Sequence, residues 1–160
     1  MPETRIIDFE PRHSDDWKQL NLAWIRQYWE PEASDFKVLD HPIDNVIEPG
    51  GCILLAEREG EIIGTCALLK MDDGGFELAK MSVAEKAQGQ GLGALLGEAA
   101  IERARALDAT RVFLESNSVL TPAISLYEKL GFQHISGEES PYARCNVQME
   151  LRFTNTSNYS

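Results

Sequence analysis

The chain has 160 residues, of which 43 % are hydrophobic, and its formal net charge is −11. A chain of this length is expected to fold as one domain, because domains usually hold roughly 100–200 residues. The acidic charge argues against a nucleic-acid partner, which requires a basic face. It favours cationic ligands such as amines, although an acidic surface also serves solubility alone.

The N-terminal residues do not form a signal peptide, and no apolar run approaches the length that spans a membrane. The three cysteines, Cys52, Cys66 and Cys145, lie far apart and show no CxxC spacing. Neither a disulfide framework nor a metal site is therefore indicated, and the thiols are expected to be buried in the core. The sequence predicts a cytoplasmic protein that contacts no membrane and holds no metal.

The N-terminal half is predicted to combine helices with a meander of strands. Ser14 is expected to cap the first helix, and Asp15 and Asp16 in its first turn favour that position. Glu59-Gly60-Glu61 separates two apolar runs and predicts an antiparallel hairpin. The expected elements are a strand at 4–9, a helix from 14, an irregular helical segment at 34–48, and strands at 52–57, 62–69 and 76–83.

The C-terminal half is predicted to alternate helices and strands, with Gly131 ending the second helix. The expected elements are helices at 91–107 and 122–130, and strands at 112–114, 132–136 and 145–153. The predicted fold is α/β (α+β), a single three-layer domain over residues 1–153. A mixed, mostly antiparallel, twisted sheet of about six to seven strands carries helices on both faces. Residues 154–160 are predicted to be a polar tail.

A glycine-rich loop joins the third strand of the meander to the helix that begins near Gly91. Gly89, Gly91 and Gly93 fall within five residues. Glycines at this density suit a backbone that curls tightly and presents its N–H groups to a ligand. At the start of a helix these groups are unpaired and the dipole is positive, so a diphosphate is the expected ligand. A tight turn without a ligand is the alternative.

The spacing Gly89-x-Gly91-x-x-Ala94, with Glu115 downstream, also fits a dinucleotide-binding fingerprint. That motif normally begins directly at the end of a strand inside a repeated strand–helix–strand unit. Here several residues separate Val83 from the first glycine, and an antiparallel hairpin comes before the loop. The context therefore disfavours a dinucleotide-binding oxidoreductase.

The motif Gln88-x-x-Gly91-x-Gly93 resembles the Q/R-x-x-G-x-G/A motif of the GNAT superfamily of acyl-CoA-dependent N-acetyltransferases. Two further segments carry the resemblance. Met81-Ser82-Val83 resembles the strand end before this loop, and Leu126–Phe132 reads LYEKLGF, a segment typical of the family. The order of elements is also similar from residue 4 to residue 153, so the resemblance covers almost the whole chain.

The resemblance implies acetyl-CoA as cosubstrate, with its pyrophosphate on the loop and its pantetheine arm on a strand that splays from its neighbour. Many members also carry an Asn seven residues before the Tyr of LYEKLGF. Leu120 stands there, so the contact carries over to Asn117 or is absent. The implied cofactor-binding residues are Met81, Ser82, Val83, Gln88, Gly89, Gln90, Gly91, Leu92, Gly93, Ala94 and Asn117.

The resemblance also implies the catalytic groups. A protonated amine must lose a proton before it attacks, and Glu77 is the candidate base, directly or through water. Strand alternation would place Glu77, Ala79, Met81 and Val83 on one face. Tyr127 lies where the family usually places the acid that protonates the departing thiolate. A solvated glutamate and a core tyrosine are the alternatives.

The acceptor is expected to be an amine, most simply of a small molecule or amino acid, bound opposite the cofactor. Candidate wall residues are Trp24, Tyr28, Trp29 and Phe36, with Tyr142 and Arg144 at the rim. Two alternatives stay open, a protein lysine or N-terminal acetyltransferase and a non-catalytic acyl-CoA sensor. The sequence leaves the oligomeric state open, a homodimer included.

Overall fold

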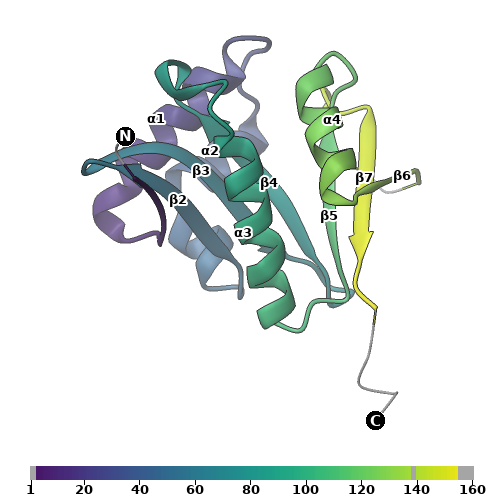
Figure 1. The fold of residues 1–160 in the computed structure, drawn as a ribbon. Coiled ribbons are helices and arrows are strands. Elements are labelled where there is room, and N and C mark those ends of the chain that lie inside the picture. The colour runs from purple at the N-terminus through teal and green to yellow at the C-terminus, as the bar shows by residue number, and fades with distance from the viewer. Residues whose placement is uncertain (1–2, 138–139, 155–160) are drawn as a thin grey trace.

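The computed structural model describes residues 3–137 and 140–154, and its elements follow the predicted order (Figure 1). Short 3₁₀ turns at Pro11–His13 and Glu85–Ala87 and a π-helical turn at Ile43–Ile47 supplement the main elements. The helices are α1 (Ser14–Ile25), α2 (Ala33–Asp40), α3 (Leu92–Ala106) and α4 (Thr121–Leu130). The strands are β1 (Thr4–Asp8), β2 (Cys52–Arg58), β3 (Glu61–Lys70), β4 (Phe76–Val83), β5 (Arg111–Ser116), β6 (Gln133–Ile135) and β7 (Val147–Arg152). Beyond Thr154 the predicted tail lies outside the described residues, so its boundary stays a prediction.

All seven strands join one sheet in the order β1-β2-β3-β4-β5-β7-β6. Every neighbouring pair is antiparallel except β4 and β5, which are parallel. Helices α1 and α2 cover one face, and α3 and α4 cover the other (Figure 1). The predicted three-layer domain with a mixed, mostly antiparallel sheet is therefore confirmed. No helix in the described ranges is long and apolar enough to cross a membrane.

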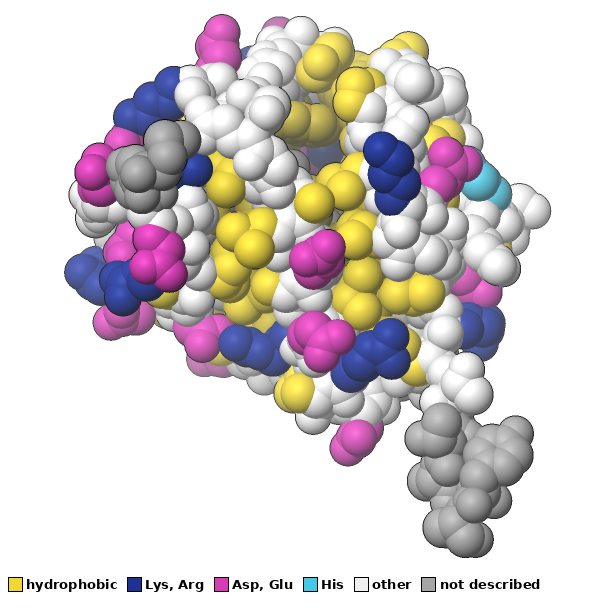
Figure 2. Space-filling model, viewed as in Figure 1, with side chains coloured by type: hydrophobic (Ala, Val, Ile, Leu, Met, Phe, Trp, Pro, Cys, Tyr) yellow, Lys and Arg dark blue, Asp and Glu magenta, His cyan; other side chains and the backbone are white. Residues whose placement is uncertain are grey.

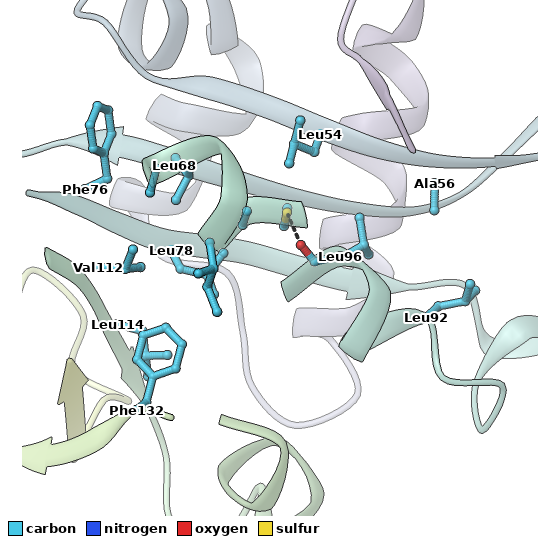
Figure 3. Close-up of a cluster of buried hydrophobic side chains, with 14 of the residues drawn as sticks. Leu54, Ala56, Leu68, Phe76, Leu78, Leu92, Leu96, Val112, Leu114 and Phe132 are labelled. Atoms are coloured by element: carbon cyan, nitrogen blue, oxygen red, sulfur yellow. Dashed lines mark hydrogen bonds between the residues drawn. The ribbon is translucent and has the colours of Figure 1, made fainter. Parts of the chain in front are cut away.

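Each face of the sheet has its own hydrophobic core. Trp17 and Leu22 of α1 and Leu39 of α2 pack on alternate side chains of β2 and β3. On the opposite face, Leu92 and Leu96 of α3 pack over the central strands, and Figure 3 shows this cluster together with Phe132. Because the alternating residues of β2 and β3 are buried on both sides, these strands read as nearly continuous apolar runs.

Strands β4 and β5 stay together over a short stretch. In the described part of the chain they pair at two positions, Phe76 with Val112 and Glu77 with Phe113. Beyond these pairs β5 continues beside β7, to which it is paired along its whole length. Among the described residues, therefore, no strand lies beside the β5-facing edge of β4 beyond Glu77, and a cleft can open there.

A β-bulge in β4 corrects one prediction. Thr65 pairs with Ser82 and Ala67 with Ala79, so Lys80 and Met81 together oppose one residue of β3. Lys80 has a φ of 55°, a left-handed conformation that is uncommon outside glycine. The bulge reverses the alternation of side chains, and the prediction that Glu77 shares a face with Met81 and Val83 is wrong. Glu77 and Ala79 face α1, whereas Met81 and Val83 pack in the core beneath α3.

The start of α1 also differs from the prediction. Ser14 is the first residue of the helix and not its cap, and its hydroxyl donates a hydrogen bond to the Pro11 carbonyl oxygen at 2.8 Å. The Pro11–His13 turn continues directly into α1, which explains why Ser14 has helical backbone angles. The helix ends at Ile25, so Tyr28 lies beyond it, 54 % exposed.

Candidate active site

A cleft opens where β4 and β5 separate, between the α1 face of the sheet and α4. Figure 2 shows a hollow near the top of the molecule, with hydrophobic side chains around it. The cleft brings together Glu77, Met81, Ser82, Asn117 and Tyr127, five of the residues that the sequence assigned to the site. The glycine loop does not line this cleft. It follows the end of β4, whose residues Met81 and Ser82 do line it.

The glycine loop has the geometry of an anion site. Gly89 and Gly91 have φ values of 79° and 80°, and a Cβ atom on either would meet nothing within 4 Å. Gly91 is the N-terminal cap of α3. Within the described residues, the backbone N–H groups from Gly89 to Ala94 donate to no acceptor. The loop therefore presents a row of unpaired N–H groups at the positive end of a helix.

Two side chains tie this loop to the sheet. The Gln88 amide donates to the carbonyl oxygen of Val83 at 3.2 Å, and Arg58 of β2 donates to the Gln90 amide oxygen at 2.7 Å. The third glycine has a packing role, since a Cβ on Gly93 would lie 3.1 Å from Leu126 of α4. Gly93 therefore lets α4 approach the start of α3, next to the cleft.

Glu77 is a partly buried carboxyl group on the cleft wall. None of the described residues donates a hydrogen bond to it. Burial, and then repulsion by the Glu115 carboxylate, raise the pKa of Glu77 to about 7, although the positive charge of Lys80 opposes them. A carboxyl group with this pKa can take up or release a proton near neutral pH.

Tyr127 lies across the cleft on α4, half-buried. Its ring packs edge-to-face on Phe132, with 6.0 Å between centroids. Burial raises the pKa of its phenol to about 12, so the hydroxyl stays protonated across the neutral range. The group can therefore donate a proton or hydrogen bond to a strongly basic leaving group.

A buried ionic cluster, which sequence reasoning missed, closes the end of the cleft. Asp35 of α2 is fully buried and forms ion pairs with Lys80 of β4 at 2.6 Å and with Arg144 at 2.7 Å. Arg144 also pairs with Glu32 at 3.2 Å. Burial alone would raise the pKa of the Asp35 carboxyl, but hydrogen bonds from Arg144 and the charge of Lys80 outweigh it and hold the pKa well below its usual range.

Tyr142 completes this cluster. Lys80 and Arg144 both lie over its ring, at 4.6 and 4.7 Å from the centroid, and Lys80 donates to its hydroxyl at 3.1 Å. The sequence placed Tyr142 and Arg144 at the rim, and both line the cleft. No local pattern marks the ion pairs of Asp35 and Lys80, because the partners in these pairs lie 45 or more residues apart in the chain.

The predicted wall residues divide into two groups. Trp24 and Trp29 line the cleft, whereas Tyr28 and Phe36 do not. Asn117 also lines it, but its amide already has partners, since Nδ2 donates to the Arg144 carbonyl oxygen at 2.6 Å and Oδ1 accepts from Val119 N–H. Asn117 therefore orders the loop after β5 in this structure. The described residues hold no group of three or more metal-binding side chains.

Comparison with known proteins assigns a family to this arrangement. The model of the acetyltransferase (GNAT) family matches residues 14–132. The chain is 35 % identical over 107 residues to Escherichia coli YjgM, named an uncharacterized N-acetyltransferase, and the match covers 62 % of this chain and 64 % of YjgM. It is 31 % identical to a Bacillus subtilis protein named as a candidate ribosomal protein bS18-alanine N-acetyltransferase, over 72 % of this chain and 79 % of that protein.

Other relatives are longer. Rat N-acetylaspartate synthetase is 33 % identical over 92 residues, which cover 57 % of this chain and 31 % of the synthetase. The chain thus spans less than two thirds of the length of YjgM and about a third of the synthetase.

Solved structures share the fold at low sequence identity. A GNAT acetyltransferase from Staphylococcus aureus Mu50 superposes with a TM-score of 0.85 at 19 % identity, covering 94 % of this chain and 99 % of that chain. Salmonella typhimurium yncA, named as a candidate acetyltransferase and solved with acetyl-CoA, has a TM-score of 0.78 at 17 % identity, covering 96 % of each chain.

Proposed function

The chain belongs to the GNAT acetyltransferase family, and we propose that it transfers an acetyl group from acetyl-CoA to a primary amine of a small molecule or amino acid. The amine would attack directly while both substrates are bound. The observation that carries this proposal is that one cleft holds an unpaired strand edge and two groups suited to proton transfer, and that a loop with unpaired backbone N–H groups follows this strand.

The residues present fit acetyl-CoA. The unpaired N–H groups from Gly89 to Ala94 would hold the pyrophosphate, because they combine free donors with a helix dipole. The free edge of β4 near Met81, Ser82 and Val83 would pair with the pantetheine arm, as an edge strand pairs with an added strand. Asn117 would contribute only if its amide changed partners. When bound, acetyl-CoA supplies the activated acetyl group.

Three groups of this chain would carry out the chemistry. Glu77 would accept the proton of the attacking amine, directly or through one water, since its pKa lies near neutrality. The backbone N–H near Met81 would donate to the acetyl oxygen as negative charge develops on it. Tyr127 would donate a proton or hydrogen bond to the departing thiolate.

A panel of acceptors tests the proposal. Acetyl-CoA consumption would be measured with polyamines, amino acids, aminoglycosides and peptides, alongside calorimetry with coenzyme A. We expect coenzyme A to bind and at least one amine to be acetylated. Binding without turnover of any amine would favour a non-catalytic acyl-CoA sensor, and no binding of coenzyme A would refute the proposal.

A protein N-terminus is the second candidate acceptor. A shallow groove formed by Trp29, Glu30, Glu32, Asn117, Ala143, Arg144 and Asn146 continues outward from the cleft and could hold an extended peptide. The name of the Bacillus subtilis relative is consistent with such an acceptor. Peptides would then be acetylated with a higher kcat/KM than their isolated N-terminal amino acids. Equal values for both would favour the small-molecule reading.

We expect the protein to act in the cytoplasm. Cys52, Cys66 and Cys145 are free thiols in the structure, which is compatible with a reducing compartment. The proposal needs a single chain, because one chain supplies every group of the cleft. It is unaffected by whether two chains associate as a homodimer.

A further inference from the structure

The Asp35 carboxylate accepts four hydrogen bonds from three separate segments. Lys80 Nζ donates to Oδ1 at 2.6 Å. Arg144 donates to Oδ1 and Oδ2 at 2.7 and 2.8 Å, and the Glu32 N–H donates to Oδ2 at 2.8 Å. Asp35 is 0 % exposed, and none of these hydrogen bonds involves the glycine loop or Tyr127. A carboxylate with this many partners fixes the position of each cation bound to it.

Lys80 is the cation of this cluster that matters most for the proposed base. It follows Glu77 by three residues in β4, and both side chains line the cleft. Its side chain is 5 % exposed, so its ammonium must have a partner within the protein. Asp35 and the Tyr142 hydroxyl supply those partners. If Asp35 were absent, the Glu77 carboxylate in the same cleft could pair with the Lys80 ammonium, because no other described residue donates a hydrogen bond to Glu77.

We propose that Asp35 is a positioning residue that holds the Lys80 ammonium away from Glu77 and so preserves Glu77 as a base. This inference rests on the proposed function, in which Glu77 takes the proton of the amine. An ammonium paired directly with a carboxylate stabilises the ionised form and lowers its pKa by about 1–3 units. A direct pair with Lys80 would therefore make Glu77 a weaker base.

The charges around Glu77 support this arrangement. Repulsion by Glu115 raises the pKa of Glu77, and the Lys80 charge lowers it. Asp35 neutralises the cation that works against basicity, while Glu32 helps to neutralise Arg144. The ionisable groups that line the cleft with Glu77 are Lys80 on β4, Glu115 on β5, Tyr127 on α4, and Tyr142, Arg144 and Cys145 on the segment before β7. Asp35 on α2 lies behind Lys80, and α1 contributes no ionisable group to the cleft.

The pH profile of kcat/KM tests the inference. Asp35→Asn keeps the size of the side chain but removes its charge, so Lys80 is free to pair with Glu77. We expect the acid limb of the profile to move about one pH unit or more to lower pH. Lys80→Gln alone should move the limb to higher pH, because the opposing cation is lost. The double variant should return the limb to the wild-type position or above it.

The double variant separates positioning from a general structural role, since damage to the fold would not be reversed by removing a second side chain. Asp40→Asn is the matched control, because Asp40 ends the same helix and pairs with Lys18 at the surface. It should leave the limb unchanged. An unmoved limb in Asp35→Asn, or a limb that stays low in the double variant, would overturn the inference.

Failure of the proposed function would look different. If Glu77→Gln abolishes the acid limb while Asp35→Asn leaves it in place, Glu77 remains the base and only the role of Asp35 is refuted. If Glu77→Gln leaves the limb intact, the assignment of the base falls, and the inference falls with it. Should Asp35→Asn fail to fold, a limb that does not rise in Lys80→Gln refutes the inference by itself.

Discussion

Glu77 shows that a group suited to catalysis can weaken the fold that holds it. Its folded-state pKa of about 7 lies above the ordinary value of 4.5, so the folded protein prefers the protonated form. The free energy of unfolding should therefore fall as pH rises from about 4.5 to about 7, and stay lower above that range. The same burial makes the group a base near neutral pH.

Glu77→Gln should accordingly stabilise the protein while it impairs turnover. At pH 8 we expect a gain of roughly 1 to 3 kcal/mol in the free energy of unfolding, because one pKa unit corresponds to about 1.4 kcal/mol. At pH 4, where Glu77 is protonated, the gain should vanish. Urea denaturation at both pH values measures the difference. Glu98→Gln, on the exposed side of α3, is the control, and an equal gain there would contradict the explanation.

Tyr127→Phe should separate chemistry from packing. The ring would keep its edge-to-face contact with Phe132, and within the described residues the hydroxyl has no hydrogen-bond partner to leave unpaired. We expect a thermal midpoint within about 2 °C of the wild type. The kcat should fall about 10- to 100-fold, which is at or below the lower limit of about 100-fold that is typical of general acid catalysis. Steady-state kinetics and thermal unfolding measure both. An unchanged kcat would leave Tyr127 a packing residue, and Tyr28→Phe, at an exposed site, is the control.

At the level of the elements, the glycine loop can be tested against a turn with the same backbone. Gly89 in the loop and Gly60 in the β2–β3 turn both have a φ of 79°, and neither has an atom within 4 Å of a Cβ position. Alanine at either site should cost about 1 kcal/mol of stability, because both would force a left-handed conformation. The strain is matched, so any further difference reports on the N–H groups of the loop.

Gly89→Ala should therefore weaken binding of coenzyme A about tenfold or more, whereas Gly60→Ala should leave the affinity unchanged. Titration calorimetry measures the affinities, and chemical denaturation checks that the two losses of stability are similar. Equal affinities in the two variants would show that the loop is a turn that needs glycine for its shape alone.

The elements themselves were largely predictable, and their irregularities were not. Apolar periodicity located each main helix and strand, and Gly131, with a φ of 106°, ends α4 as expected. The bulge at Lys80 escaped prediction because regular alternation through FELAKMSV looks intact. Its left-handed residue is a lysine, whereas local signals for such a conformation depend on glycine or asparagine.

For the whole molecule, the sequence indicates the proposed cofactor loop more directly than the proposed acceptor side. The loop from Gln88 to Ala94 is contiguous, so its motif is visible in one stretch of sequence. The acceptor side is assembled from α1, α2, β4 and the segment before β7, and Asp35 meets Arg144 across 109 residues. Only the tertiary fold brings these side chains together, and no periodicity or spacing reports such a meeting.

The gap between β4 and β5 divides the sheet into two halves, β1–β4 and β5–β7. The two halves are joined by two β4–β5 pairs and by the ion pair of Arg144 with Asp35 of α2. They are also joined by the contact of α3 with α4, which is close because a Cβ on Gly97 would lie 2.7 Å from Leu130. A ligand that occupies the gap between the strands should pair with β4 and hold the halves together. Its effect should therefore concentrate at the free strand edge and the loop.

Hydrogen exchange measures this effect. On addition of coenzyme A, those amides in residues 78–94 that have no partner in the protein should exchange more slowly at labelling times of seconds, because hydrogen bonds to the ligand replace hydrogen bonds to water. Amides of β1 and β2, already paired in the sheet, should be unchanged at these times and slow only at long times, through the general stabilisation that binding confers. Gly89→Ala should reduce the early protection at an equal concentration of ligand. Early protection that spared residues 78–94 and appeared around α1 and α2 would place the ligand on the other face of the sheet and contradict the proposed cofactor site.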